Sequence, residues 1–341
     1  MGWARTTAIA AFAFLALSAA SAASAETIKI GVSKIANCAP IAVALAKGYF
    51  TAEGLDAQLT IFQAQAPVAV AVASGDLDFG DAAQTAALYN LGVDGRVRIV
   101  ASGAAEAPSF HALALVASNK AFAAGLKSPR DLPGHSFALT QMGTGLQYSL
   151  GKIAAKERFD LSTVTLMPLQ SNPNIASAVA GGRADAAVFD STNALPLIEK
   201  DEVKLIGWVG DLTGYTPAFL MFASRDMVDH HSDTVKHFLA AYRKAVRDYY
   251  VAFTDAQGMR KDEPTAAAVL DVIAKWVEQP PARVALGLPY FDRDARVDMA
   301  ATQDQIDWYR SIGAIKGSVL AATVVDQRYA VDRPETNAAA H

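Results

Sequence analysis

The chain has 341 residues, and its 30 basic and 34 acidic residues give it a formal net charge of −4. An acidic chain without a basic run is a poor binder of nucleic acid, because the phosphate backbone is recognised by clustered Lys and Arg. Its only cysteine, Cys38, excludes an intramolecular disulfide, so stability must come from a packed core. A chain of this length exceeds what one core usually fills, and two domains are therefore expected.

Residues 1–25 are typical of a secretory signal peptide. Arg5 precedes an apolar run at 8–20, and small residues stand at a cleavage site before Glu26. The run is shorter than the roughly 20 residues of a membrane-spanning helix, and no later stretch qualifies as one. Removing the signal would leave 29 basic against 34 acidic residues, a net charge of −5. We therefore expect an exported protein that is not embedded in a membrane.

Strands and helices alternate along the chain up to about residue 223, which favours an α/β fold. Short apolar or alternating runs indicate the strands, and apolar residues three and four apart indicate the helices. From residue 233 onward the pattern is helical, beginning with an apolar stripe at 235–246. Strands are predicted at 27–32, 57–62, 77–80, 110–117, 135–139, 163–167, 184–188, 203–209 and 217–223. Helices are predicted at 39–50, 66–74, 82–91, 144–157, 174–181, 192–200, 264–277 and 302–312.

A loop of small and polar residues at 140–145 joins the predicted strand at 135–139 to the predicted helix at 144–157. The first N–H groups of a helix have no partners within it and carry a partial positive charge, so such a loop can hold an anion or a polar group. The alternative is that Thr144 only caps the helix while the glycines turn the chain. The sequence leaves both possibilities open.

The two halves of the chain share a local pattern. In the first half a helix stops at Gly75, and a short strand then leads to Asp81; in the second half Gly182 and Asp190 stand in the same order. Independent use of Gly as a helix stop and of Asp as a helix cap would explain the pattern equally well. If the halves are related, Asp81 and Asp190 lie on opposite walls of a cleft, because ligands of open α/β sheets bind outside the carboxyl ends of the strands.

The domain division follows from the turns between these halves. The turn-rich segment at 127–134 suggests that the chain crosses between the units near it. The strand at 217–223 is expected to return to the first unit. We therefore assign residues 26–114 and 220–341 to one lobe and 115–219 to the other.

Motifs of familiar enzymes are missing from the sequence. It contains no HExxH, GxSxG, GxxxxGK[ST] or CxxC, and Tyr148 stands where a dinucleotide fingerprint starting at Gly143 would need its last glycine. Cys38 could act as a nucleophile with His111 as its base, but a lone cysteine after a first strand is more often a packed residue. We predict no catalytic residue, no metal site and no cofactor, and favour binding over turnover.

Longer runs resemble a known family of exported binding proteins. The runs KIGVSKIANCAPIAVALAKGYFTAEGLDAQL and VAVAVASGDLDFGDAAQTAAL resemble the opening of periplasmic solute-binding proteins of the nitrate, sulfonate and taurine importer family. Relatives of the thiamine-pyrimidine type share this opening. The runs SPRDLPGHSFALTQMGTGLQYSL and ASAVAGGRADAAVFDSTNALPL resemble the second lobe of that family, and the resemblance covers roughly residues 28–250.

The resemblance implies a two-lobed periplasmic binding protein of the type II kind, with two crossover strands as a hinge. Such proteins close on a small solute and then dock on the membrane permease of an ABC importer, which a cytoplasmic ATPase powers. We accordingly expect a monomer whose partners are a small-molecule solute, the permease and its ATPase, with no nucleic acid. A less favoured alternative is an enzyme on the same fold, similar to the pyrimidine synthases.

Carried over by position, the resemblance also implies a set of cleft residues. No arginine occurs in the implied cleft loops and Lys34 is their only lysine, so a sulfonate would depend on helix N-termini and hydroxyl groups. Carboxylates would instead suit an amine or a ring N–H. The family favours a sulfonate or a taurine-like amino sulfonate, with a pyrimidine-like nitrogen heterocycle as the alternative. The expected ligand-binding residues are Asn37, Cys38, Asp81, Gln84, Phe110, His111, Gln141, Thr144, Asp190, Thr192 and Tyr215.

Overall fold

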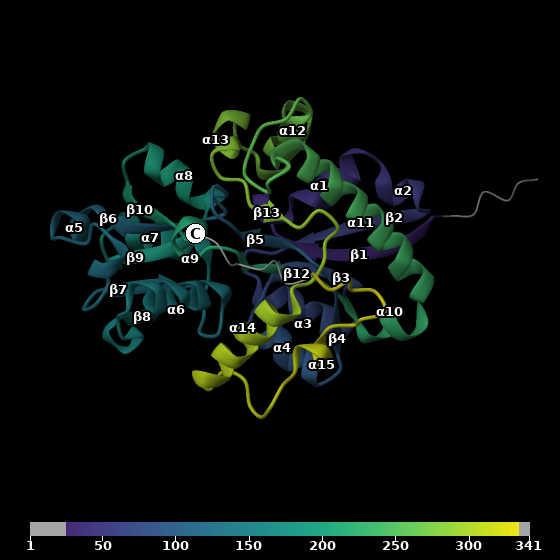
Figure 1. Cartoon of the computed structure of the whole chain (residues 1–341), viewed down its shortest axis with the longest axis horizontal. Coiled ribbons are helices and arrows are strands. Elements are labelled where there is room, and N and C mark those ends of the chain that lie inside the picture. Colours follow the sequence, from purple (N-terminus) through teal and green to yellow (C-terminus); the bar gives the residue numbers. More distant parts are fainter. Residues whose placement is uncertain (1–24, 334–341) are drawn as a thin grey trace, which may run out of the picture.

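A computed structural model describes residues 25–333, and the predicted signal peptide lies outside these residues apart from its last position. The chain forms two lobes side by side, each built on a five-stranded sheet with helices on both faces (Figure 1). A small three-stranded sheet lies where the lobes join. No helix within the described range combines the length and the apolar character that crossing a membrane requires.

The sheet of lobe 1 has the strand order β2-β1-β3-β12-β4. Its strands β1, β2 and β3 are parallel, whereas β12 runs antiparallel to both of its neighbours, β3 and β4. This antiparallel strand is the one that returns from lobe 2. The strands are β1 (Glu26–Val32), β2 (Leu55–Ile61), β3 (Phe79–Ala83), β4 (Val97–Ser102) and β12 (Phe219–Ser224).

The sheet of lobe 2 repeats this arrangement in the order β10-β6-β9-β7-β8. Strands β7, β8 and β9 are parallel, and β6 runs antiparallel to β9 and β10. The strands are β6 (Leu113–Ser118), β7 (Ser136–Leu139), β8 (Thr165–Pro168), β9 (Ala186–Asp190) and β10 (Val203–Trp208).

The two lobes are joined through the small sheet, whose order is β11-β5-β13. The chain leaves lobe 1 through β5 (Ala104–Glu106) and returns through β11 (Thr216–Pro217), and these two crossover strands pair with each other. Leu113 already pairs with Asp190 in the sheet of lobe 2, so the first crossing lies between residues 106 and 113. The turn-rich segment at 127–134 belongs wholly to lobe 2, and the crossing suggested there is wrong. The turns of this segment instead flank the short helix η2 (Pro129–Asp131).

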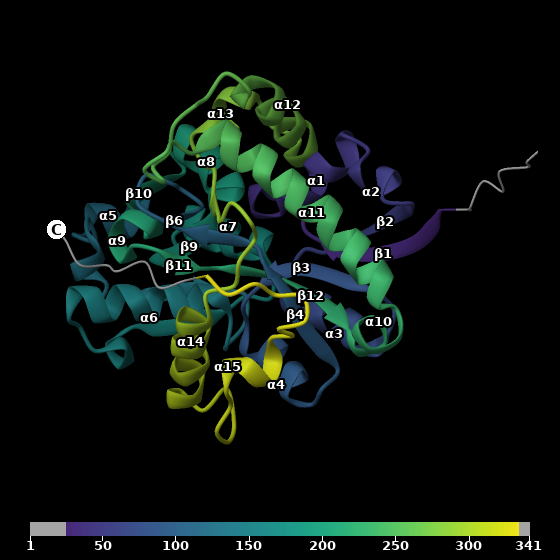
Figure 2. The same cartoon turned by 45° about the vertical axis from the view of Figure 1, so that its right-hand side comes forward.

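Helices cover both faces of each sheet. In lobe 1, α11 (Ser232–Phe253) is the longest and lies across the sheet beside α1 (Ala39–Ala46) (Figure 2), where the Phe238 ring stacks on Phe79 at 3.9 Å. The helices of lobe 2 are α5 (Asn119–Ala123), α6 (Gly145–Glu157), α7 (Asn172–Ala180), α8 (Ser191–Glu199) and α9 (Val209–Thr213). Lobe 1 carries η1 (Ala36–Cys38), α1 (Ala39–Ala46), α2 (Tyr49–Ala52), α3 (Ala66–Ser74), α4 (Ala86–Val93), α10 (Arg225–His230) and α11 (Ser232–Phe253). The C-terminal part adds α12 (Ala266–Val277), α13 (Pro281–Ala285), β13 (Tyr290–Phe291), α14 (Met299–Ser311) and α15 (Ala321–Val324).

Two predicted helices differ in their bounds for local reasons. The helix predicted at 39–50 is broken into α1 and α2 because Gly48 adopts a left-handed backbone conformation with φ of 67°. The helix predicted at 82–91 begins only at Ala86, because β3 continues to Ala83 and Thr85 then caps the helix. The Thr85 hydroxyl accepts a hydrogen bond from the Leu88 N–H at 3.1 Å.

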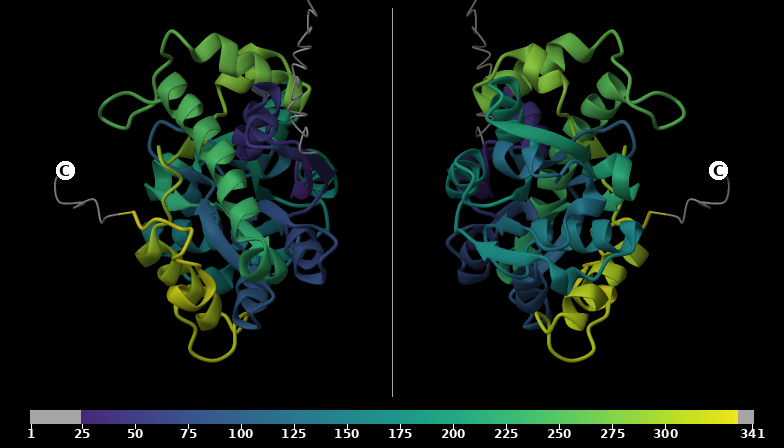
Figure 3. Two further views of the ribbon diagram at one scale, coloured as in Figure 1. Left: turned by 90° about the vertical axis from the view of Figure 1, so that its right-hand side faces the viewer. Right: turned by 90° about the vertical axis from the view of Figure 1, so that its left-hand side faces the viewer.

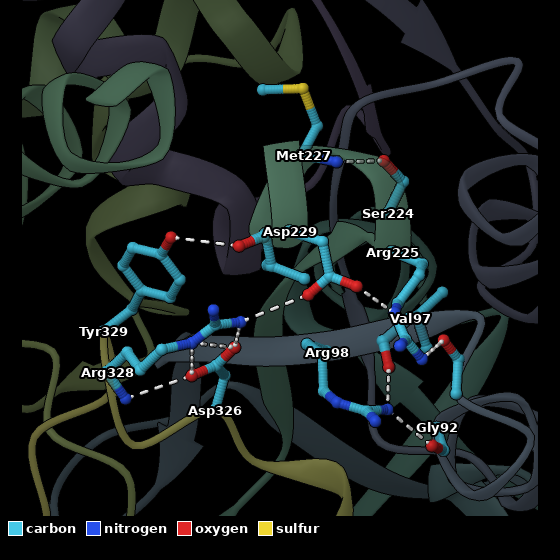
Figure 4. Close-up of polar contacts among 12 residues, drawn as sticks. Gly92, Val97, Arg98, Ser224, Arg225, Met227, Asp229, Asp326, Arg328 and Tyr329 are labelled. Atoms are coloured by element: carbon cyan, nitrogen blue, oxygen red, sulfur yellow. Dashed lines mark hydrogen bonds and ion pairs between the residues drawn. The ribbon is translucent and has the colours of Figure 1, made fainter. Parts of the chain in front are cut away.

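The C-terminal segment returns to lobe 1 and is fastened there by charged side chains (Figure 4). The Arg328 guanidinium donates two parallel hydrogen bonds to the buried Asp326 carboxylate, and also reaches Asp229 of α10 at 3.5 Å. The Tyr329 hydroxyl donates to the Val228 carbonyl at 3.3 Å. These contacts fix the segment that carries α14 and α15, which lie together at one end of the molecule (Figure 3).

Candidate ligand-binding site

A cavity lies where the two lobes and both crossover strands meet. The centre of a water-sized sphere has about 50 Å³ of free space in it, and the cavity is partly open to solvent. Lobe 1 contributes Ala83 and Thr85 to its wall, and β5 contributes Glu106. The second crossover contributes residues 216–219, and lobe 2 contributes the loop before α6 and the end of β9. A site between domains that both domains line is where small-molecule ligands are commonly bound.

The loop before α6 forms one wall of this cavity. Thr144 does not cap α6, because its hydroxyl donates to the Gln141 carbonyl at 3.0 Å. The Gly143 N–H is occupied by the Gln147 side chain at 2.7 Å, and the Gly143 carbonyl accepts the Ala86 N–H of lobe 1 at 2.9 Å. Thr144 thus stands at the N-cap position of α6 without capping it through its side chain, and Gly143 turns the chain at a φ of 74°. Gln141 and Thr144 both line the cavity, as the sequence predicted for the loop.

Asp190 stands at the last position of β9 and lines the cavity from lobe 2. Its side chain makes no hydrogen bond to the start of α8, although it occupies the capping position of that helix. The residue is only 7% exposed, and burial raises the pKa of its carboxyl to about 6. Its charge at neutral pH is therefore held in a poorly hydrated place, without a cationic partner within the described part of the chain.

Glu106 of β5 is a second carboxyl in the cavity wall, and sequence reasoning missed it. It is 1% exposed, and neither carboxylate oxygen makes a well-formed hydrogen bond among the described residues, although the backbone N–H groups of Leu113 and Gly210 face the carboxyl. Burial raises its pKa well above the usual range, and the negative charge of Asp190 adds to the shift. Its signal in the sequence is a single acidic residue within the small-residue run GAAEAP, in the crossover that precedes an apolar strand.

Asn37, Cys38 and Asp81 lie behind the cavity rather than in its wall. All three are fully buried, and the side-chain polar atoms of Asn37 and Asp81 have no partner in the described structure. Burial raises the pKa of Asp81 to about 8 and that of the Cys38 thiol well above its ordinary value. The Cys38 sulfur lies 3.7 Å from the Asp81 carbonyl oxygen. A thiol that stays protonated in this way is a packed residue rather than a nucleophile.

Gln84 is likewise buried beside the cavity without lining it. Its side-chain oxygen lies 2.5 Å from the Tyr89 hydroxyl, which is also 2.8 Å from Gln305. Gln305 of α14 does line the cavity. The C-terminal helix α14, none of whose residues was among the expected ligand-binding residues, thus contributes to the wall.

Phe110, His111 and Tyr215 lie outside the cavity wall. Phe110 is fully buried against Tyr290, with the two rings edge to face at 5.3 Å. The Tyr215 ring also packs against Tyr290, and the Arg333 guanidinium carbon lies over it, 3.7 Å from the ring centre. The His111 ring stacks on Trp208 at 4.5 Å, away from Cys38, so the pair does not form a nucleophile and base.

Contacts between the lobes hold the cavity closed. The Thr192 hydroxyl accepts the Ala36 N–H at 3.1 Å, and the Thr192 carbonyl accepts the Gln279 side chain at 2.6 Å. The adjacent Ser191 hydroxyl donates to the Gly287 carbonyl at 2.5 Å. Thr192 therefore takes part in closure, and the cavity wall does not include it.

The charge of the cavity is wholly acidic. No Lys, Arg or His side chain of the described residues lines it, whereas Glu106 and Asp190 do. Lys34, the only lysine of the predicted cleft loops, forms an exposed ion pair with Glu278 instead. Among residues 25–333 no three potential metal ligands gather in one place.

Two lobes built on sheets of matching topology, two crossover strands and a cavity between the lobes define a two-lobed periplasmic-binding-protein fold. The profile of the NMT1/THI5-like family matches residues 35–252, and the chain belongs to that family. The comparison with curated protein sequences finds no match.

Several solved structures share the fold at low sequence identity. The alkanesulfonate-binding protein SsuA from Xanthomonas axonopodis pv. citri, bound to MOPS, has a TM-score of 0.69 and 19% identity over 88% of this chain and 98% of its own. The ligand-binding component of an ABC-type import system from Staphylococcus aureus has a TM-score of 0.69 and 12% identity over 88% and 96%. The periplasmic nitrate-binding protein NrtA from Synechocystis PCC 6803 has a TM-score of 0.69 and 14% identity over 90% and 86%.

Proposed function

We propose that the protein is an extracytoplasmic receptor of an ABC importer, which captures a small organic solute between its lobes and delivers it to a membrane permease. The observation that carries this proposal is the cavity lined by both lobes and by both crossover strands. A hinge motion at β5 and β11 would open and close it. The predicted signal peptide and the periplasmic relatives support export to the periplasm.

The cavity also bears on the solute classes that the sequence left open. A free sulfonate or nitrate needs cationic or N–H donors, and the cavity wall formed by the described residues offers two carboxyls and no cation. This distribution weighs against the simple sulfonate that the family resemblance favoured. It supports a solute that carries N–H groups, either a nitrogen heterocycle or the amine end of an amino sulfonate.

A solute that the protein binds is expected to stabilise it strongly. At one hundred times its dissociation constant, a ligand that binds only the folded state adds about 2.7 kcal/mol to the free energy of unfolding. A thermal-shift screen of sulfonates, amino sulfonates, amines and pyrimidines measures this effect directly. If no member of these classes shifts the melting temperature, the proposed receptor function is wrong.

The alternative of an enzyme on the same fold is tested with the best stabiliser from that screen. A receptor returns its solute unchanged, so mass spectrometry after prolonged incubation should find only the starting compound. A new product that depends on the protein would instead support the enzyme.

A further inference from the structure

The two carboxyls of the cavity wall have no cationic partner among the described residues that line it. Glu106 and Asp190 are each more than nine-tenths buried, and they enter the cavity from different parts of the fold. Buried carboxyls are normally paired with a cation or several donors, because burial without a partner is costly. Here no side chain of the described residues pairs with Glu106, which has only the backbone N–H groups of Leu113 and Gly210 beside it, and Asp190 makes no capping bond. Such groups indicate that the partner is the bound solute.

The rest of the wall can accommodate only a limited range of solute charges. Its other polar groups are neutral, among them Thr140, Gln141 and Ser149. Lys34 of the predicted cleft loops and Arg333 of the C-terminal segment are engaged elsewhere, since Lys34 pairs with Glu278 and Arg333 lies over Tyr215. An anion would meet two carboxyls without a compensating cation, whereas a cation would meet two matching partners.

We propose that the solute carries a positively charged nitrogen group, such as a protonated amine, amidine or aminopyrimidine, held between Glu106 and Asp190. This inference rests on the proposed receptor function and gives the chemical class of its solute. The neutral side of the cavity, formed by the loop before α6, would bind the remainder of the molecule.

The two carboxyls also connect the solute to the parts that move on closure. Glu106 pairs in the small sheet with Thr216, so it stands on one crossover strand and contacts the other. Asp190 directly precedes Ser191 and Thr192, whose hydrogen bonds to lobe 1 hold the lobes together. A cation bridging the two carboxyls would therefore draw lobe 2 against the hinge and favour the closed state.

The pH dependence of solute affinity is a second way to test the charge of the solute. The titratable groups that face these two carboxyls are each other, the Cys38 thiol of η1 and Asp211 of α9, and none of them is a cation. The backbone N–H groups of Leu113 and Gly210 also face Glu106. Burial raises the pKa of Asp190 to about 6 and that of Glu106 further above its usual range. A bound cation favours the ionised carboxyls, so its affinity should rise with pH. An anion bound by protonated carboxyls should show the opposite trend.

The test uses the full mature chain and a probe panel matched for size. Ethanolamine, guanidine and acetamidine supply nitrogen cations that stay protonated from pH 5 to pH 8, and 4-aminopyrimidine supplies a heterocycle that is protonated only toward pH 5. Taurine supplies the zwitterion, and ethanesulfonate and nitrate supply the anions. Thermal shift identifies binders, and calorimetry then measures the dissociation constant of the best one between pH 5 and pH 8. We expect a nitrogen cation or taurine to bind best, with about tenfold weaker binding at pH 5 than at pH 8.

Two conservative variants probe the carboxyls one at a time. Glu106→Gln and Asp190→Asn keep the size of the side chain, and each should weaken binding of that probe at least tenfold and flatten its pH dependence. Asp201→Asn, at an exposed carboxyl of lobe 2, is the matched control and should change neither. Because each variant replaces a buried carboxyl that makes no ion pair by a neutral amide of the same size, both should fold, and circular dichroism checks this.

The inference is overturned if no nitrogen-bearing probe stabilises the protein, if affinity falls as the pH rises, or if both variants bind as the wild type does. Tight binding of ethanesulfonate or nitrate alone would overturn this inference and leave the receptor function standing. Chemical conversion of a bound probe would instead overturn the receptor function itself.

Discussion

Replacing Asp81 by Asn is expected to stabilise the protein, and to do so more strongly as the pH rises. Asp81 is fully buried, and burial raises its pKa to about 8 against a small opposing effect of the Cys38 thiol. In the unfolded chain the same carboxyl ionises near pH 4. Ionisation therefore favours the unfolded state, and the loss of stability begins near pH 4, grows with pH and is complete above pH 8. At pH 7 it amounts to about 4 kcal/mol, which the neutral amide would recover.

Urea unfolding of the wild type and of Asp81→Asn at pH 5 and pH 8 measures this effect. The difference in the free energy of unfolding should be small at pH 5 and several-fold larger at pH 8. Asp185→Asn is the control, because it is expected to change the free energy of unfolding in the opposite direction. Although burial opposes it, hydrogen bonds from Ser136 lower the pKa of Asp185, so losing this carboxylate should destabilise the protein at both pH values. Equal stability of Asp81→Asn and the wild type at pH 8 would show that the Asp81 carboxyl is hydrated or paired.

Asp78 and Asp185, which directly precede β3 and β9, show why the similarity between the two lobes was predictable from the sequence. They also show why the residue-by-residue alignment of the lobes was not. Asp78 and Asp185 each follow a helix-ending glycine, and each accepts a backbone N–H from the first of the parallel strands of its lobe, from Lys29 of β1 at 2.7 Å and from Ser136 of β7 at 2.9 Å. The shared pattern therefore reflects a shared structural role. Aligning the lobes on these residues makes β3 (Phe79–Ala83) and β9 (Ala186–Asp190) correspond over their full length.

In that alignment Asp190 corresponds to Ala83 and not to Asp81. Both Ala83 and Asp190 end their strands and line the cavity, whereas Asp81 lies two residues earlier and is buried under η1 and α11. The sequence-based prediction paired Asp81 with Asp190 because both are aspartates near the end of a short strand. It did not take into account how many residues separate each aspartate from the start of its strand. A strand end can be located only once its hydrogen-bonded partners are known, and those partners are distant in the chain.

The elements themselves were predictable because their signals are local. Apolar periodicity and turn residues define the alternating strands and helices, and the small polar loop at 140–145 marked a wall of the cavity. Glu106 and Gln305 were missed because only tertiary packing brings them to the same cavity. Phe110, His111 and Tyr215 were placed by resemblance alone, and packing on Tyr290 and Trp208 turns them elsewhere.

Replacing Gly210 by Ala is expected to destabilise the protein by about 3 kcal/mol or more. Gly210, near the start of α9, lies against the first crossover, where an added Cβ would come within 2.4 Å of the Ala107 carbonyl oxygen and 2.8 Å of that of Phe110. These are backbone atoms, which a rotamer change cannot move aside. The crossover would have to shift as a whole, and Glu106 at its start would shift with it.

Gly207→Ala is the matched control, because it makes the same change three residues earlier in the same lobe. There the added Cβ meets only the end of the Leu212 side chain, at 2.8 Å, and that side chain can rotate away. Urea unfolding should therefore place Gly207→Ala within about 1 kcal/mol of the wild type and Gly210→Ala well below it. Since the crossover carries Glu106 into the cavity, Gly210→Ala should also bind the best nitrogen-bearing probe more weakly at a temperature where it remains folded. A Gly210→Ala variant as stable as its control would mean that the first crossover is not seated on α9, and α9 would then have no part in positioning Glu106.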